Sequence, residues 1–416
     1  MTTALEQSDS PATVVVGAGH GGGTLAAQLR QQGYRGQIIL VGAEPHLPYH
    51  RPPLSKKFLS GQYEQWLRPD DFYTSQDIDV RVNTTVSAID RPARRIITAS
   101  GVEIGYEHLV LATGATARKL DVPGGSLERI LTLRNLDDAA QLRRIVPTAG
   151  NVVIVGGGYV GLEVAAEISA RSAAKVTVLE REHRILARVA SPTFSDLMHR
   201  QHASRGIEIL TETDVVGFSG DSNGAVSAVR LSNGDEITCG AVLVGVGAVP
   251  CDGLARSAGL LCDKGIVVDG ESRSSDRSIF AIGDVSQRSL GDSAEPIRLE
   301  SIPNAVEQAK QVAAAITGSP IPRPEVPWFW SDQFDLQLKI AGLIRADTVT
   351  AVRGDPDTGK FAIFHLDQND TVVAVETSNS PQSFMAGKKA IADRSRAVPG
   401  LLSDPAVGFK ECFVSQ

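Results

Sequence analysis

Cysteine is scarce in this chain, and its distribution excludes one kind of redox centre. Four cysteines are spread over 416 residues without a C-x-x-C pair: Cys239, Cys251, Cys262 and Cys412. A dithiol relay of the thioredoxin kind needs such a pair, so we exclude it and predict four small, buried, apolar residues. The eight histidines show no metal-ligand spacing, and we predict no metal site. His199 and His202 could share a helical face, which we predict to be a solvated surface.

Several other features are also missing. Residues 1–10 have neither a basic start nor an apolar core, which argues against a signal peptide. No apolar stretch approaches the length of a membrane span. The formal net charge of −7 opposes general binding to nucleic acid. We therefore predict a cytoplasmic protein without a membrane segment or a nucleic-acid partner.

Glycine, in contrast, is abundant, and two glycine-rich motifs stand out among the 40 glycines. Both fit G-x-G-x-x-G: Gly17-Ala18-Gly19-His20-Gly21-Gly22 and Gly156-Gly157-Gly158-Tyr159-Val160-Gly161. Each follows an apolar β-branched run and opens a helix-forming stretch. An acid lies 22 residues after the first motif, at Glu44, and 19 residues after the second, at Glu180. These spacings are typical of dinucleotide sites, so the sequence predicts two of them.

The glycines and the acids have distinct physical roles in such a site. The first glycine permits the turn, the second lets the backbone approach the pyrophosphate, and the third lets helix and strand pack closely. The helix start then offers N–H groups to the pyrophosphate. Glu44 and Glu180 would accept hydrogen bonds from ribose hydroxyls, and Glu180 would repel a 2′-phosphate. We predict a preference for NADH over NADPH, although Arg181, directly after Glu180, counts against it. Two dinucleotides in one chain also predict electron transfer from one to the other.

The motifs lie in a repeated α/β pattern. We predict βαβ units over 12–41 and 151–179, a helix over 193–205, and strands over 80–86, 96–99, 108–112 and 243–250. Residues 279–284 resemble a strand that returns to the first domain, which makes that domain discontinuous. A linker with four prolines covers 316–327. The predicted domains are 1–116 with 251–325, then 117–250, then 326–416.

Narrower motifs carry a resemblance to a known family. They are Pro48-Tyr49-His50-Arg51-Pro52-Pro53-Leu54-Ser55-Lys56, Gly161-Leu162-Glu163-Val164-Ala165-Ala166, Ala281-Ile282-Gly283-Asp284, Glu300-Ser301-Ile302-Pro303-Asn304-Ala305 and Val326-Pro327-Trp328-Phe329-Trp330-Ser331-Asp332-Gln333. The chain resembles oxygenase-coupled NADH–ferredoxin reductases from its first strand to at least Lys389. The resemblance implies an α/β fold with two Rossmann-like domains of the glutathione-reductase kind, one inserted in the other. A C-terminal α+β domain would cover the flavin and shape the docking face.

The resemblance also implies the site residues. FAD would contact Gly17, Ala18, Gly19, Gly22, Glu44, Arg51, Lys56, Val86, Ala112, Thr113, Gly114, Arg134, Asp284, Ile302 and Trp330. NADH would contact Gly156, Gly157, Gly158, Tyr159, Val160, Gly161, Glu163, Glu180, Val246 and Gly247. Lys56, Glu163 and Trp330 would be the catalytic residues. Ile302 would start a helix aimed at the pyrimidine edge of the flavin, where reduction places negative charge.

The implied reaction takes a hydride from NADH to FAD and passes electrons singly to a [2Fe–2S] ferredoxin. The ferredoxin would supply a cytochrome P450 or a ring-hydroxylating dioxygenase. Five lysines are candidates for steering this acidic partner: Lys310, Lys339, Lys388, Lys389 and Lys410. Two alternatives stay open. One is an NADH oxidase, peroxidase or monodehydroascorbate-type reductase; the other is a redox-sensing protein that binds FAD and NADH.

Overall fold

Two compact units make up the computed structural model, which describes residues 12–290 and 295–414. Unit 1 comprises the chain up to His50, Trp66–Thr116 and Val249–Pro324. Unit 2 comprises Arg51–Gln65, Ala117–Ala248 and the chain from Glu325 onward. The three domain boundaries that the sequence predicts stay predictions.

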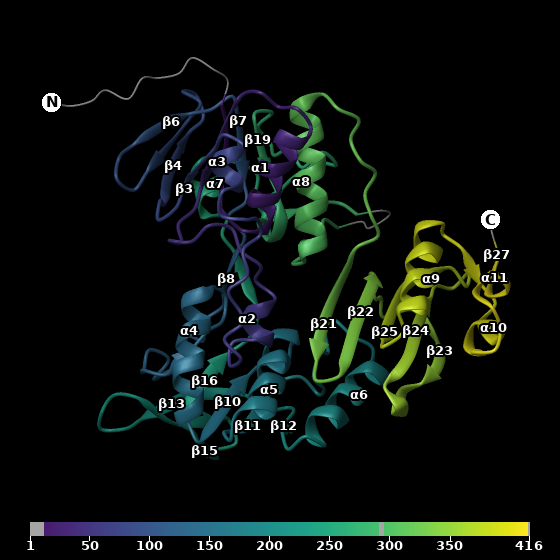
Figure 1. The fold of residues 1–416 in the computed structure, drawn as a ribbon. Coiled ribbons are helices and arrows are strands. Elements are labelled where there is room, and N and C mark those ends of the chain that lie inside the picture. The colour runs from purple at the N-terminus through teal and green to yellow at the C-terminus, as the bar shows by residue number, and fades with distance from the viewer. Residues whose placement is uncertain (1–11, 291–294, 415–416) are drawn as a thin grey trace. The chain divides into compact units, whose positions relative to one another are not determined.

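The centre of unit 1 is a five-stranded parallel sheet in the order β19-β7-β1-β2-β3. Its strands are β1 (Ala12–Val16), β2 (Gln37–Val41), β3 (Ile78–Arg81), β7 (His108–Leu111) and β19 (Ile279–Ala281). All five residues of β1 are buried, as expected for a parallel strand covered on both faces. Helices α1 (His20–Gln31) and α8 (Ile302–Thr317) pack side by side against the sheet (Figure 1).

Smaller elements complete unit 1. They are α3 (Phe72–Ser75), β4 (Val86–Asp90), β5 (Arg95–Thr98), β6 (Glu103–Gly105), α7 (Gly253–Ser257), β18 (Ile266–Val267), η2 (Gly283–Val285) and β20 (Ser286–Gln287). Strands β4, β5 and β6 form an antiparallel sheet of their own. The strands β8 (Ala115–Ala117) and β17 (Ala248–Pro250) lie where the chain passes between the units.

Unit 2 contains a second parallel sheet, in the order β12-β11-β10-β16-β9. Its elements are α2 (Pro53–Lys56), β9 (Ile130–Leu131), α4 (Leu136–Ile145), η1 (Val146–Thr148), β10 (Asn151–Val155), α5 (Tyr159–Arg171), β11 (Lys175–Leu179), α6 (Pro192–Ala203), β12 (Glu208–Leu210), β13 (Val215–Gly220), β14 (Val226–Leu231), β15 (Glu236–Thr238) and β16 (Ala241–Val244). The β1-α1-β2 and β10-α5-β11 units thus repeat one arrangement, with parallel register between each strand pair. The predicted Rossmann-like repeat is confirmed.

The C-terminal part of unit 2 is an antiparallel sheet in the order β21-β22-β25-β24-β23, and α9 packs on it (Figure 1). Its elements are β21 (Trp328–Gln333), β22 (Leu336–Gly342), β23 (Val349–Asp355), η3 (Pro356–Thr358), β24 (Lys360–Leu366), β25 (Val372–Ser378), α9 (Pro381–Ala392), β26 (Arg396–Ala397), α10 (Pro399–Ser403), α11 (Phe409–Cys412) and β27 (Phe413–Val414). One hydrophobic core joins this sheet to the second Rossmann unit, since Leu338 and Phe361 pack with Leu162 and Phe194. The sheet therefore supports α5 and α6.

Three element predictions need correction. The strand predicted over 80–86 is two strands, because β3 ends at Arg81 and β4 begins at Val86. Residues 243–250 are likewise not one strand: β16 ends at Val244 and β17 begins at Ala248. The linker begins later than predicted, since α8 continues to Thr317 and ends at Gly318, whose φ of 69° forms a left-handed cap.

Other predictions concerned membrane segments and cysteines. Within the two described ranges, no helix is long and apolar enough to cross a membrane. None of the four cysteines forms a disulfide there, and Cys239 and Cys412 are buried as predicted. Cys251 and Cys262 are only partly buried, so the prediction of four buried cysteines was too broad.

Candidate functional site

The first glycine motif forms a tight turn between β1 and α1. Gly17 has a φ of +114°, and a Cβ there would lie 2.1 Å from the carbonyl oxygen of Ala112. A Cβ on Gly22 would lie 2.0 Å from the carbonyl oxygen of Gly17. Gly19 is the N-cap of α1, and no side chain in the described part of the chain caps that helix. The first N–H groups of α1 are thus available to an anionic ligand.

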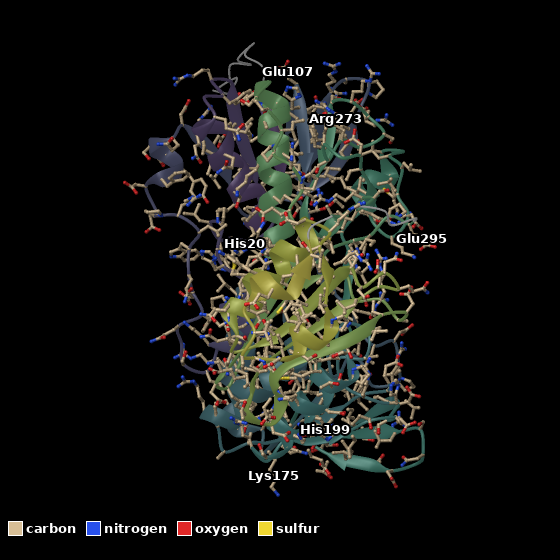
Figure 2. The ribbon with its side chains drawn as sticks, turned by 90° about the vertical axis from the view of Figure 1, so that its right-hand side faces the viewer. His20, Glu107, Lys175, His199, Arg273 and Glu295 are labelled. Atoms are coloured by element: carbon tan, nitrogen blue, oxygen red, sulfur yellow. The ribbon has the colours of Figure 1, made fainter. Side chains whose placement is uncertain are left out.

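The predicted acid follows the next strand. Glu44 lies just beyond β2, and its Oε2 accepts a hydrogen bond of 2.5 Å from the hydroxyl of Tyr49. On the same unit, the ring of His20, labelled in Figure 2, lies 3.1 Å from that of His50 between Nε2 and Nδ1. A Cβ on Gly23, in the first turn of α1, would lie 2.8 Å from the Pro48 ring. The segment that begins at Pro48 therefore starts beside the N-terminus of α1.

The turn after β7 is fixed by two hydrogen bonds to one residue. Thr113 Oγ1 donates to the Cys251 carbonyl over 2.8 Å, and Cys251 N donates to the Gly114 carbonyl over 2.9 Å. Ala112, just before this turn, is the residue that Gly17 approaches. Ala112, Thr113 and Gly114 therefore lie at the carboxyl edge of the unit 1 sheet, where doubly wound folds bind ligands.

Asp284 and Ile302 also reach this region of unit 1. Asp284 follows β19 in the short helix η2, and Gly283 N donates to Gln308 Oε1 on α8 over 2.8 Å. Helix α8 begins at Ile302, as predicted, and Ser301 Oγ caps it by accepting from Asn304 N over 3.3 Å. Val86 instead lies at the start of β4, paired with Thr98. The contacts of these residues with FAD stay predictions.

The second motif repeats the same turn in unit 2. Gly156 has a φ of +109°, and a Cβ there would lie 2.5 Å from the Gly245 carbonyl oxygen. A Cβ on Gly161 would lie 2.4 Å from the Gly156 carbonyl oxygen. Gly158 caps α5 without a side-chain hydrogen bond, and a Cβ on it would meet nothing within 4 Å. Protein packing does not require a glycine at Gly158, whereas close approach of a pyrophosphate does.

Glu180 is held against this turn by two backbone donors. Its Oε2 accepts from Gly157 N over 2.8 Å, and its Oε1 accepts from Glu182 N over 2.9 Å. Arg181 is largely exposed and turns to Glu182, with 3.4 Å between Nε and Oε1. The carboxylate of Glu180 is thus fixed where a ribose would bind. Val246 and Gly247 follow β16 on the same sheet edge, and Gly247 has a φ of +104°.

A buried ion pair lies near the start of α5. Lys56 Nζ on α2 lies 2.8 Å from Oε1 of Glu163, whose side chain is 6% exposed. Ser55 Oγ donates to Oε2 of the same carboxylate, and Ser331 Oγ donates to Oε1 over 2.5 Å. Two of the three predicted catalytic residues are therefore in contact, and two serines complete their surroundings.

Beyond Ser331 the hydrogen bonds continue into the core of unit 2. Gln333 Nε2 donates to Ser331 Oγ over 3.0 Å, and Gln333 Oε1 lies 2.8 Å from His202 Nε2. His202 on α6 is fully buried, so the prediction of a solvated surface there was wrong. Burial lowers the pKa of His202 to about 4, although the hydrogen bond to Gln333 opposes this shift. The side chain is therefore neutral.

Tyr159 and Trp330 lie on either side of β21. The Tyr159 ring packs edge-on against Phe329 at 4.8 Å between centroids. Its hydroxyl is buried, with no hydrogen-bond partner among the described residues. Burial, with Glu376 and Glu163 nearby, holds the pKa of this phenol well above its ordinary value. Trp330 projects from the opposite face of β21 and stacks at a tilt on Trp328, 5.7 Å away.

The candidate docking lysines are distributed over both units. Lys388 lies over the Trp328 ring at 5.3 Å and pairs with Glu325 at 3.0 Å. Lys339 lies over the Phe384 ring at 5.5 Å. Lys389 pairs with Asp393 over 2.5 Å, Lys410 lies on α11, and Lys310 lies on α8 of unit 1.

Two further predicted FAD residues lie in unit 2 and contact each other. Arg51 donates from an η nitrogen to the Arg134 carbonyl over 2.6 Å. Arg134 N in turn donates to Asp138 Oδ2 over 2.7 Å, beside the capping box that starts α4. The contact explains how the chain places Arg51, while its role toward FAD stays a prediction.

The turns in both units fit a bound dinucleotide. Each turn has glycines at which a Cβ would clash with a carbonyl oxygen, a helix start without a side-chain cap and a carboxylate beyond the next strand. Among the other helices of ten or more residues that the structure describes, α4, α6 and α8 are capped by the side chains of Asn135, Ser191 and Ser301, whereas α9 has no side-chain cap. Among the described residues, no group of three or more His, Cys, Asp or Glu could hold a metal ion.

Two such dinucleotide units in one chain indicate an oxidoreductase that uses a nicotinamide and a flavin dinucleotide. Comparison with protein families supports this class. Residues 11–309 match the model of pyridine nucleotide-disulphide oxidoreductases, and residues 328–413 match the reductase C-terminal model. The chain belongs to the pyridine nucleotide-disulphide oxidoreductase family and carries this C-terminal domain. The enzyme therefore uses FAD and NAD(H), as the sequence predicts.

Comparison with curated proteins and solved structures supports the same family assignment. The chain is 44% identical to a probable ferredoxin reductase, CtmF, of Castellaniella defragrans over 95% of this chain and 97% of that protein. It is 39% identical to putidaredoxin reductase CamA of Pseudomonas putida over 97% and 96%. A crystal structure of the covalent putidaredoxin reductase–putidaredoxin complex matches with a TM-score of 0.93 and 37% identity, covering 97% of this chain and 98% of that chain. The resemblance drawn from the motifs is confirmed.

Sequence reasoning missed the serines and the buried amide and imidazole around Glu163. Ser331 and Gln333 stand in a quoted motif but were not predicted as site residues. A signal was present: alternate residues of a strand face one side, so Phe329, Ser331 and Gln333 share a face. No local pattern links this face to His202, 131 residues away.

Proposed function

We propose that this enzyme takes a hydride from NADH onto FAD and passes the electrons singly to a [2Fe–2S] ferredoxin. That ferredoxin would supply a cytochrome P450 or a ring-hydroxylating dioxygenase. The observation that carries the proposal is the pair of glycine turns in a chain without a C-x-x-C dithiol. Electrons then have no internal disulfide to reduce and leave for an external acceptor. The printed names of relatives, ferredoxin and putidaredoxin reductases, support a ferredoxin as that acceptor.

Each turn is assigned one cofactor. The turn from Gly17 to Gly22, with Glu44, would bind the pyrophosphate and adenosine ribose of FAD. The turn from Gly156 to Gly161, with Glu180, would bind those of NADH. FAD supplies the two-electron to one-electron exchange when it is bound. Because both oxygens of Glu180 are held by backbone donors, the carboxylate stays in place to reject a 2′-phosphate.

Lys56 and Glu163 are the proposed catalytic pair. Glu163 lies in the first turns of α5, next to the NADH turn, and Lys56 contacts it from α2. The ammonium and the carboxylate would orient the nicotinamide carboxamide and set the charge where hydride transfer takes place. Trp330 lies on the face of β21 opposite to Ser331, and its proposed role is contact with FAD rather than with this pair. A cytoplasmic location is kept as a prediction from the sequence.

The docking surface is proposed on the C-terminal sheet. Lys339 and Lys388 lie over aromatic rings there, which combines positive charge with apolar area. Such a surface suits an acidic iron–sulfur protein, since complementary charge raises the association rate. Reversal of one charge is expected to raise the KM for ferredoxin about tenfold at low salt.

The test is NADH-dependent reduction of cytochrome c with and without a panel of [2Fe–2S] ferredoxins. We expect fast reduction only when a ferredoxin is present. Rapid oxygen or peroxide consumption without any carrier would favour an oxidase, and a reduced complex indifferent to every ferredoxin would favour a redox sensor. Lys388→Glu should impair the ferredoxin step, while the control Lys175→Glu, at an exposed lysine labelled in Figure 2, should not.

A further inference from the structure

A continuous chain of hydrogen bonds connects the catalytic pair with the buried imidazole of His202. It runs from His202 on α6 through Gln333 and Ser331 on β21 to Glu163 on α5. All three links are between 2.5 and 3.0 Å long. Every residue in this chain lies within unit 2. The C-terminal domain thus reaches the Lys56–Glu163 pair by direct bonds as well as by packing.

The donors and acceptors in this series of hydrogen bonds allow only one direction of donation. The Ser331 hydroxyl has one proton, and a carboxylate can only accept, so Ser331 donates to Glu163. Ser331 Oγ therefore accepts from the amide NH₂ of Gln333, which leaves Gln333 Oε1 facing His202. An amide oxygen can only accept, so His202 carries its proton on Nε2. Each group then donates toward the Glu163 carboxylate.

Burial agrees with this direction. Ser331 and Gln333 are each 1% exposed and His202 is 0% exposed, so water does not compete for the links. With the proton on Nε2, His202 Nδ1 is an acceptor, and it is buried without a partner among the described residues. The opposite tautomer would instead bury an unpaired Nδ1–H donor, and it would set two acceptors against each other within the series of hydrogen bonds. Hydrogen bonds aligned in one direction polarise one another in a region of low dielectric constant.

We propose that Ser331, Gln333 and His202 are positioning residues that hold the Glu163 carboxylate toward Lys56. The proposal rests on the assignment of Lys56 and Glu163 to hydride transfer. Oε1 of Glu163 faces both the Lys56 ammonium, at 2.8 Å, and Ser331, at 2.5 Å. Without Ser331, the carboxylate could rotate about its last bond and still satisfy Lys56 or Ser55. Ser331, Gln333 and His202, called the relay below, therefore determine which carboxylate oxygen of Glu163 faces the nicotinamide site.

The kinetic test follows flavin reduction by NADH in the FAD-loaded enzyme with a stopped-flow spectrometer. Ser331→Ala should lower the limiting rate about tenfold, as expected for loss of one hydrogen bond to a charged group. The apparent dissociation constant of NADH should stay within about threefold, because the pyrophosphate and ribose contacts remain. Ser378→Ala is the matched control: its hydroxyl is also fully buried in the C-terminal sheet and donates to Gly359 O, outside the relay.

Further variants separate positioning from folding. His202→Phe removes the last donor and should slow flavin reduction in the same direction, whereas His202→Gln keeps a donor there and should restore it. In a Glu163→Gln background, Ser331→Ala should change the rate by less than about twofold, because its effect passes through the carboxylate. Equal additional losses in both backgrounds would overturn the relay.

A readout independent of activity is the histidine ¹⁵N spectrum of the holoenzyme. His202 should show the Nε2–H tautomer, and an Nδ1–H tautomer would overturn the direction of the chain. Failure of the proposed function looks different. If Glu163→Gln leaves flavin reduction unchanged, the Lys56–Glu163 assignment fails; if it slows reduction but Ser331→Ala does not, only the relay fails.

Discussion

His202 should make the stability of the enzyme depend on pH in a specific window. Its imidazole has a pKa of about 4 in the folded protein, compared with about 6.5 in an unfolded chain. Burial is the main cause, and Arg205 and His199 add to it, while the bond to Gln333 opposes it. The unfolded state therefore takes up a proton first as pH falls, and stability is lost between about pH 6.5 and pH 4.

The size of this effect follows from the two pKa values. A difference of about 2.5 units corresponds to about 3.4 kcal/mol, of which about 2.5 kcal/mol is lost between pH 7 and pH 4.5. Because His202 is 0% exposed, solvent does not screen the effect. A domain of this size changes its Tm by about 2 °C per kcal/mol, so the expected extra fall is about 5 °C.

Thermal unfolding of the holoenzyme at several pH values tests this reasoning. Between pH 7 and pH 4.5, the Tm of the wild type should fall about 5 °C further than that of His202→Gln, which has no titrating group there. His199→Gln is the control, since His199, labelled in Figure 2, lies on the same helix but is partly exposed. Parallel loss of Tm in the wild type and His202→Gln would refute the assignment.

Three other changes should have distinct effects. Glu180→Ala should reduce the NADH/NADPH ratio of kcat/KM at least about tenfold, and an unchanged ratio would mean that the ribose contact is misplaced. Gly17→Ala should lower the flavin content per protein, measured by absorbance, because its Cβ would lie 2.1 Å from the Ala112 carbonyl oxygen. The control Gly33→Ala should retain FAD, because a Cβ on Gly33 would meet nothing within 4 Å. Glu376→Ala should lower the free energy of unfolding, measured in urea, by about 3 kcal/mol or more, because Ser191 N and the buried His365 lose their acceptor. A decrease below about 1 kcal/mol would contradict this.

Local patterns were sufficient to predict the dinucleotide turns. Gly22 and Gly161 are required by the carbonyl oxygens of Gly17 and Gly156, which lie in the same motifs. An apolar run before each motif and a helix-forming run after it then specify strand, turn and helix. Ile302 was predicted as a helix start from the family resemblance, and the structure shows the local reason: Ser301 is a good N-cap and Pro303 suits the first turn.

Local patterns were insufficient where one residue depends on another far along the chain. The gap at 82–85 was missed because Val82, Thr84 and Thr85 are good strand formers, while hydrogen bonding to β2 ends at Arg81. His202 was misjudged for a related reason. Its helix reads as half polar, and only the C-terminal sheet, more than 120 residues later, supplies Gln333 to cover it. Burial of a polar side chain is decided by its partner, and the partner is not in the local sequence.

The two faces of β21 have different partners. Phe329, Ser331 and Gln333 face Tyr159, Glu163 and His202 in turn. Trp328 and Trp330 face the other side, where Lys388 lies. A shift of one residue in register would exchange the two faces and bury indole rings against the Glu163 carboxylate. One strand thus serves the proposed hydride site on one face and the proposed docking surface on the other, so an insertion or deletion within β21 would disturb both.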